Sequence, residues 1–399
     1  MRGLCAAGAL YVAATIALTW PLAAGLAHHI PGDFGDPLFT SWVIAWDATH
    51  LGRGWWQANI YAPHPLALAY SEHFLPQALQ VLPIYALTKN PVLCYNLLFL
   101  STFVLSALGM FLYARDLTGR DDAALVAGFA FAFTPYRIGS LPHLQVLSAA
   151  WMPFVLLGIR RYAQTRRVRP LVGAAAAWLV QNLSCGYYLL FFSPIVVGYA
   201  AWELARTGAW RDRRALAQVA VAGLAVAAAT VPFLLPYIEL RQLGFSPRSL
   251  SETRRFSADV FAYLTADPNL WLWGPIAHAW PYAEGVLFPG LTIVALAIVG
   301  IVGLRRPTGQ RLVVSIIALL WIVIVVMLLL DFPIRLPGIK ITNLTRVLVS
   351  GTVAAATLLA ASRQARAATI AWLQTPAAFF TLTTVFAVAM SFGPDVHAR

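Results

Sequence analysis

Long runs of apolar residues recur along the whole chain, separated by short connections rich in arginine or in proline and glycine. A helix needs about 20 apolar residues to cross the hydrocarbon core of a bilayer, and about eleven segments are candidates. The 399 residues are 60% hydrophobic and 11% charged, which is far from the composition of soluble domains. We therefore expect an all-α polytopic membrane protein, with residues 1–399 forming a single transmembrane domain.

The formal net charge of +12 is explained by membrane topology rather than by nucleic-acid binding. A nucleic-acid interface needs a basic stripe with aromatic side chains on a soluble face. Here the arginines gather in short connections at 160–169, 206–214 and 305–311. The positive-inside rule assigns these connections, and with them the N-terminus, to the cytoplasm. Two large segments, 27–90 and 237–285, then lie outside. High alanine and arginine contents with only two lysines, Lys89 and Lys340, fit a GC-rich bacterial source, so we expect the membrane to be the bacterial inner membrane.

The first outer segment contains two stretches that suit helices on the membrane surface. Residues 37–51 place Trp42 and Trp46 at helical spacing, as in an interfacial helix with aromatic rings at headgroup depth. Residues 74–88 are too short and polar to span, and they contain Pro83. The chain ends at Arg399, directly after an expected span, an end consistent with a piece of a longer protein.

Asp33 and Asp36 follow the first apolar run within a few residues, between Gly32, Gly35 and Pro37. A carboxylate held in a tight turn beside the bilayer is partly desolvated and can accept a proton from a hydroxyl. The alternative is purely structural, with Asp33 closing a turn and Asp36 capping the helix that follows. The two roles can coexist.

Other polar residues of the outer side form three further candidate groups. Glu72 and His73, near the end of the first outer segment, can join Asp36 in an acid/base or divalent-metal constellation, although their spacing matches no established metal pattern. The second group lies in a turn between two expected spans and consists of Arg137, His143 and Gln145. The third group is Arg254 and Arg255, in the second outer segment. Each arginine is a candidate clamp for a lipid phosphate, or else a side chain reaching for headgroups.

Four stretches carry a family resemblance: "GDFGDPLFTSWVIAW", "NIYAPHPLALAYSEHFL", "NPVLCYNLLFLSTFVLSALGMFLYARDLTG" and "FAFTPYRIGSLPHLQVLSAAWMPFVLL". Together they resemble the N-terminal half of bacterial membrane proteins of the GT-C glycosyltransferase superfamily, close to the YfhO-like and uncharacterised glycosyltransferase-like groups. The resemblance covers about residues 1–205 well and the remainder only in its pattern of spans.

The resemblance implies a GT-C fold and transfer of a sugar from a polyprenyl-phosphate donor, with inversion, on the outer face. It implies that Asp36 or Asp33 is the general base and that Arg137 and His143 neutralise the leaving phosphate. Glu72 and His73 would line the site or hold a divalent metal ion. The acceptor, a glycan, lipid or protein, is not identified.

Two other classes of function remain open. A transporter or flippase of a lipid-linked glycan would show inverted repeats and ionisable residues near the middle of the membrane. The polar residues gather instead at the outer rim, which favours chemistry at the surface. A non-catalytic membrane assembly protein would use the outer segments for docking.

Overall fold

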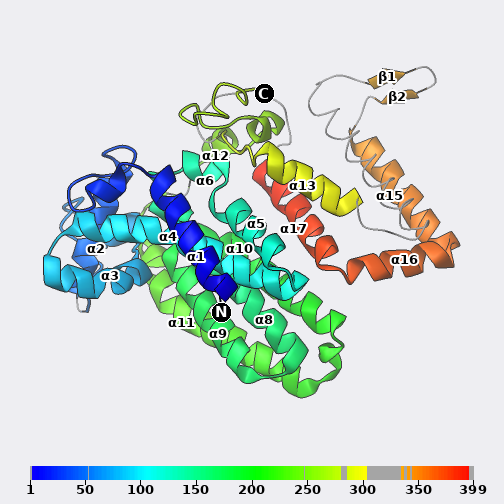
Figure 1. Cartoon of the computed structure of the whole chain (residues 1–399), viewed down its shortest axis with the longest axis horizontal. Helices are drawn as coiled ribbons and strands as arrows, with labels where there is room; N and C mark the ends of the chain where they lie inside the picture. Colours follow the sequence, from blue (N-terminus) through cyan, green and yellow to red (C-terminus); the bar gives the residue numbers. More distant parts are fainter. Residues whose placement is uncertain are drawn as a thin grey trace. The chain divides into compact units, whose positions relative to one another are not determined.

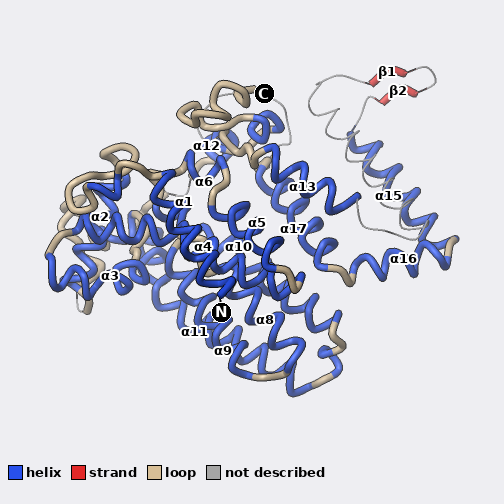
Figure 2. Tube along the Cα trace, viewed as in Figure 1, coloured by secondary structure: helices blue, strands red, loops and turns tan. Residues whose placement is uncertain are grey.

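The computed structural model describes residues 2–52, 54–246, 248–279, 285–302, 334–336, 339–341 and 344–394. It divides into two compact units, residues 1–247 and 248–399, which are described separately. Helices make up nearly all of the regular structure in the described ranges (Figure 2), as the sequence predicts. The single transmembrane domain stays a prediction. The basic connection 305–311 and the apolar run 312–330, one of the candidate spans in the sequence, lie outside the described residues.

The first unit is built from consecutive helices, with short connections from α3 onwards and longer ones, residues 19–35 and 51–74, on either side of α2 (Figure 1). They are α1 (Arg2–Leu18), α2 (Asp36–His50), α3 (Leu75–Thr88), α4 (Pro91–Thr118), α5 (Asp121–Ala132), α6 (Pro135–Gly139), α7 (Leu144–Leu147), α8 (Met152–Thr165), α9 (Val168–Ser184), α10 (Gly186–Arg206) and α11 (Arg213–Gln242). Short 3-10 turns lie at Leu22–Ala24, Ala67–Tyr70 and Ala209–Arg211.

Three of these helices, α4, α10 and α11, are long and apolar enough to cross a membrane. Helices α16 (Arg363–Leu373) and α17 (Pro376–Ser391) of the second unit add a fourth crossing if the pair, bent by 84°, forms one span. Helix α1 and helix α13 (Leu291–Val302) are apolar but shorter. These helices agree with a membrane protein, whereas about eleven spans and a GT-C arrangement remain proposals.

The two helices expected on the membrane surface are both present, within one residue of their expected starts. Each has proline in its first turn, where the missing N–H costs no hydrogen bond. In α2 the rings of Trp42, Trp46 and His50 stack in sequence along one face. The opposite side of α2 buries Val43 and Ile44 in a core shared with α3 and α4.

One of the candidate spans in the sequence, residues 144–159, is not a continuous helix, because the structure breaks it into α7 and α8. The backbone groups freed at the break are satisfied by the amide of Gln181 on α9. Its Nε2 donates to the Ser148 carbonyl at 2.8 Å, and its Oε1 accepts from the Trp151 N–H at 3.2 Å. A buried amide thus replaces the missing helical hydrogen bonds.

A buried ion network joins the ends of α4, α8 and α10. Arg160 lies between Asp116, at 2.9 Å, and Glu203, at 3.3 Å, and Arg206 also contacts Glu203 at 2.6 Å. Glu203 is fully buried and accepts a further bond from Tyr199. The ends of α8 and α10, which the arginine pattern assigns to the cytoplasm, therefore meet the end of α4 at one end of the unit.

The second unit has fewer described elements. Besides α13, α16 and α17 they are α12 (Leu250–Phe256), a 3-10 turn at Val260–Leu264, β1 (Ile334–Leu336), β2 (Ile339–Ile341) and α15 (Leu344–Ala361). Strands β1 and β2 pair antiparallel, with Arg335 opposite Lys340. The segment after α12 is tied to the end of α17, since the Ala258 N–H donates to the Ser391 carbonyl at 2.9 Å.

Candidate functional site

The structure brings Asp36 and His143 together, although 107 positions separate them in sequence. His143 Nε2 lies 3.5 Å from Asp36 Oδ2, and about half of each side chain is exposed. Asp36 is the first residue of α2, where the partial positive charge of the helix end favours a carboxylate. The Asp36 carboxylate, which can accept a proton, thus faces the His143 imidazole in a position that a ligand can reach.

The turn before α2 holds Asp33 beside this pair. One carboxylate oxygen of Asp33 accepts the Gly35 N–H at 2.8 Å, so Asp33 closes the turn as the structural alternative predicts. Asp36 instead begins the helix, with Gly35 in the capping position. Asp33 is therefore partly engaged locally, whereas Asp36 is available to His143.

Close packing fixes the two loops against each other. Gly32 has a φ of +79°, and a Cβ there would lie 2.9 Å from the ring of Pro142, next to His143. Only glycine adopts this positive φ without strain and also leaves room for the Pro142 ring. On the other side, Asn96 of α4 donates to the carbonyls of Leu26 and His29 at 2.8 and 2.7 Å. Helix α4 thereby anchors the start of the loop that carries Asp33 and Asp36.

Two cavities adjoin the segment that contains His143. The first has a volume of about 380 Å³ and is mostly apolar; its lining includes Trp20, Pro21, Pro31, Gly32, Phe99 and Leu141. The second has a volume of about 440 Å³ and contains three of the expected site residues, Glu72, His73 and Gln145. Asp36 lines neither cavity, so the expected grouping of Asp36 with Glu72 and His73 is replaced by its pairing with His143.

Glu72 and His73 are held in different ways. Both oxygens of the half-buried Glu72 carboxylate accept the Gly186 N–H at the start of α10, at 3.0 and 3.1 Å, and burial raises the pKa of Glu72. Burial lowers the pKa of His73 to about 4, because its ring packs between Trp55, Trp56 and Phe233. His73 is therefore neutral at ordinary pH.

A further acid, Asp47, was not indicated by the sequence pattern. It is fully buried on α2, where Oδ1 accepts the indole N–H of Trp55 at 2.7 Å and Oδ2 has no hydrogen-bond partner in the described structure. Burial raises its pKa to about 8, against the effect of the Trp55 bond. Its position on the face with Val43 and Ile44 was the available signal, since 43, 44 and 47 share one side of a helix.

Arg137 is buried and faces inward. Its guanidinium donates to the carbonyls of Ala132, at 3.1 Å, and Leu147, at 2.9 Å, and burial lowers its pKa to about 10. The role of phosphate clamp stays a prediction that this geometry does not favour. Arg254 and Arg255 lie on α12 in the second unit, so their expected role also stays a prediction.

The described residues contain no group of three or more His, Cys, Asp or Glu side chains arranged to hold a metal ion. No protein-family model, no curated protein and no solved structure matches the chain.

Proposed function

We propose that the protein is a GT-C-type glycosyltransferase of the bacterial inner membrane, with about eleven spans and its active site on the outer face. It moves a sugar from a polyprenyl-phosphate donor to an acceptor hydroxyl. The observation that carries this proposal is the accessible pair of Asp36 and His143, 3.5 Å apart, beside Asp33.

In the proposed reaction Asp36 is the general base. Its carboxylate takes the proton of the acceptor hydroxyl while that oxygen bonds to the anomeric carbon of the sugar. The bond from the anomeric carbon to the lipid phosphate breaks with inversion, and the phosphate leaves with the bonding electrons. His143, when protonated, offsets negative charge on Asp36 or on the leaving phosphate.

The two cavities supply room for a lipid-linked sugar. The mostly apolar cavity of about 380 Å³ lies beside the end of α1 and suits part of a prenyl chain. The cavity of about 440 Å³ offers Glu72 and Gln145 as hydrogen-bond partners and Tyr187 and Tyr237 as flat apolar faces for a sugar. Both volumes lie within the range of about 300–1,000 Å³ that is common for ligand sites.

The test is sugar transfer in membranes that contain equal amounts of wild type, Asp36→Asn, Asp33→Asn and His143→Gln, supplied with a panel of radiolabelled polyprenyl-phosphate sugars. Loss of a general base lowers rates by about 10²- to 10⁴-fold, and we expect this for Asp36→Asn. Asp33→Asn should retain more activity because half of its carboxylate serves the local turn. Glu252→Gln, which removes an exposed acid, is the control.

Two outcomes would contradict the proposal. Full activity of Asp36→Asn would remove the proposed base. No consumption of any donor by the wild type above empty membranes would instead favour a transporter of lipid-linked glycans or a membrane assembly protein.

A further inference from the structure

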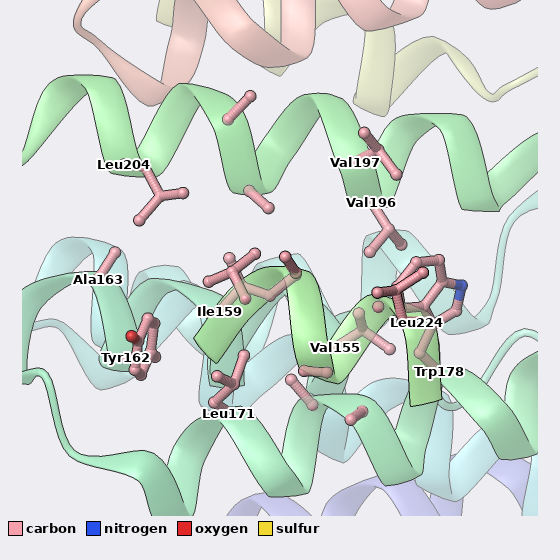
Figure 3. A pocket seen from close by; sticks show the side chains of 18 of the residues that line it. Val155, Ile159, Tyr162, Ala163, Leu171, Trp178, Val196, Val197, Leu204 and Leu224 are labelled. Atoms are coloured by element: carbon pink, nitrogen blue, oxygen red, sulfur yellow. The ribbon is translucent and has the colours of Figure 1, made fainter. Parts of the chain in front are cut away.

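A large apolar cavity lies among α8, α9, α10 and α11, apart from the candidate site. Its volume is about 640 Å³ (Figure 3). Tyr162, Ala163 and Leu204 lie at one end of the view, and Trp178, Val196 and Val197 at the other. Val197 and Leu224 are 60% and 70% exposed, so the cavity opens sideways between α10 and α11.

The residues that line the cavity offer no free polar group to a ligand. The Tyr162 hydroxyl donates its one hydrogen to Gln218 Oε1, at 2.8 Å, with the Ala215 carbonyl farther away at 3.3 Å, and the Trp178 N–H donates to Ser193. The remaining lining residues are apolar or glycine. A polar ligand would lose its hydrogen bonds with water without replacement, so the fitting occupant is a hydrocarbon chain.

One end of the cavity is surrounded by arginines. Arg166 donates to the carbonyl of Ala163, a lining residue, and the positive charges of Arg166 and Arg214 act on the Tyr162 hydroxyl together with the negative charge of Asp212. The connections that end α8 and begin α11 carry five exposed arginines: Arg167, Arg169, Arg211, Arg213 and Arg214. The acid among them, Asp212, caps α11 by accepting the Arg214 N–H. The apolar cavity therefore ends in a cluster of positive side chains, called here the arginine rim: Arg166, Arg167, Arg169, Arg211, Arg213 and Arg214.

We infer that this cavity binds one acyl chain of an anionic glycerophospholipid, whose phosphate rests on the arginine rim. A hydrocarbon slot between apolar helices that ends in a basic cluster combines burial of the chain with attraction of the headgroup. The site lies at the helix ends that are opposite to Asp36 and His143. It is independent of the proposed sugar transfer.

The acyl-chain part is tested by filling the cavity. Gly223 lines it on α11, and a Cβ there meets no atom within 4 Å, so Gly223→Phe places a ring in the slot without a backbone clash. Gly198→Phe on α10 is the matched control, because Gly198 is equally open but does not line the cavity. Native mass spectrometry of the purified protein, given phosphatidylglycerol of fixed acyl composition, counts the lipids bound.

We expect Gly223→Phe to lose one tightly bound phosphatidylglycerol that the wild type and Gly198→Phe retain. Gly223→Leu, a smaller filler, should lower occupancy as well, and it serves if the phenylalanine variant does not fold. Equal lipid binding by folded Gly223 variants and the Gly198 control would overturn the inference.

The headgroup part is tested by competition between phosphatidylglycerol and phosphatidylcholine with identical chains. One arginine near an anionic headgroup is worth about a fivefold preference, so Arg214→Gln should lower the wild-type preference by about that factor. Arg241→Gln, an exposed arginine at the far end of the same helix, should leave it unchanged. A wild type without preference, or equal losses in both variants, would overturn the assignment of an anionic lipid.

Discussion

The buried carboxyl of Asp47 makes the stability of the protein depend on pH in a defined direction. Burial raises its pKa from 3.8 to about 8, so the folded chain binds a proton that the unfolded chain releases between these values. The free energy of unfolding therefore falls as the pH rises from about 4 towards 8. The slope is about 1.4 kcal/mol per pH unit, or about 4 kcal/mol between pH 5 and pH 8.

Asp47→Asn should remove this slope and keep the bond from Trp55, because an amide oxygen can accept the same indole N–H. The variant should then exceed the wild type in stability by an amount that grows with pH. His73, whose lowered pKa adds an opposite slope below about pH 6.5, is present in both proteins and cancels in the difference.

The assay is urea unfolding in mild detergent at pH 5, 6, 7 and 8, followed by tryptophan fluorescence. Asp122→Asn is the control, since Asp122 is exposed and its pKa is lowered, which places its titration below this range. A constant difference between wild type and Asp47→Asn across the four pH values would refute the reasoning.

Two further substitutions test buried charges. Glu203→Gln should lower the free energy of unfolding by about 3–5 kcal/mol, because Arg160 and Arg206 lose a buried partner; Glu252→Gln, in an exposed pair, should cost under about 1 kcal/mol in the same urea titration. Arg137→Gln should cost about 1–3 kcal/mol for each buried carbonyl left without a donor. Loss of sugar transfer by Arg137→Gln at unchanged stability would instead support the phosphate clamp.

The sequence located helices α2 and α3 to within one residue of their starts. Proline in the first turn and aromatic residues at helical spacing mark α2, and the shortness and polarity of the run around Pro83 mark α3 as a helix that does not span. The break between α7 and α8 precedes Pro153, a local signal, whereas Gln181, which satisfies the backbone groups freed there, is 30 or more positions away and no local pattern reveals it.

The candidate site also combines features that the local sequence predicts with contacts between residues that are distant in sequence. The position of Asp36 at a helix start could be read from Gly35 and Pro37, whereas its partner could not. His143 lies beside Asp36 where Gly32 packs on Pro142, a contact between two loops that are distant in sequence. Likewise, the sequence suggests that Arg137 is a surface cation, and only the folded chain reveals the backbone carbonyls that accept its hydrogen bonds.

Helix α4 contacts both loops of the candidate site. Its Asn96 holds the loop that leads to Asp36, and its Thr102 carbonyl accepts a hydrogen bond at 3.5 Å from Arg137, six residues before His143. A substitution that shifts α4 is therefore expected to move both members of the pair together and to leave the gap between them unchanged.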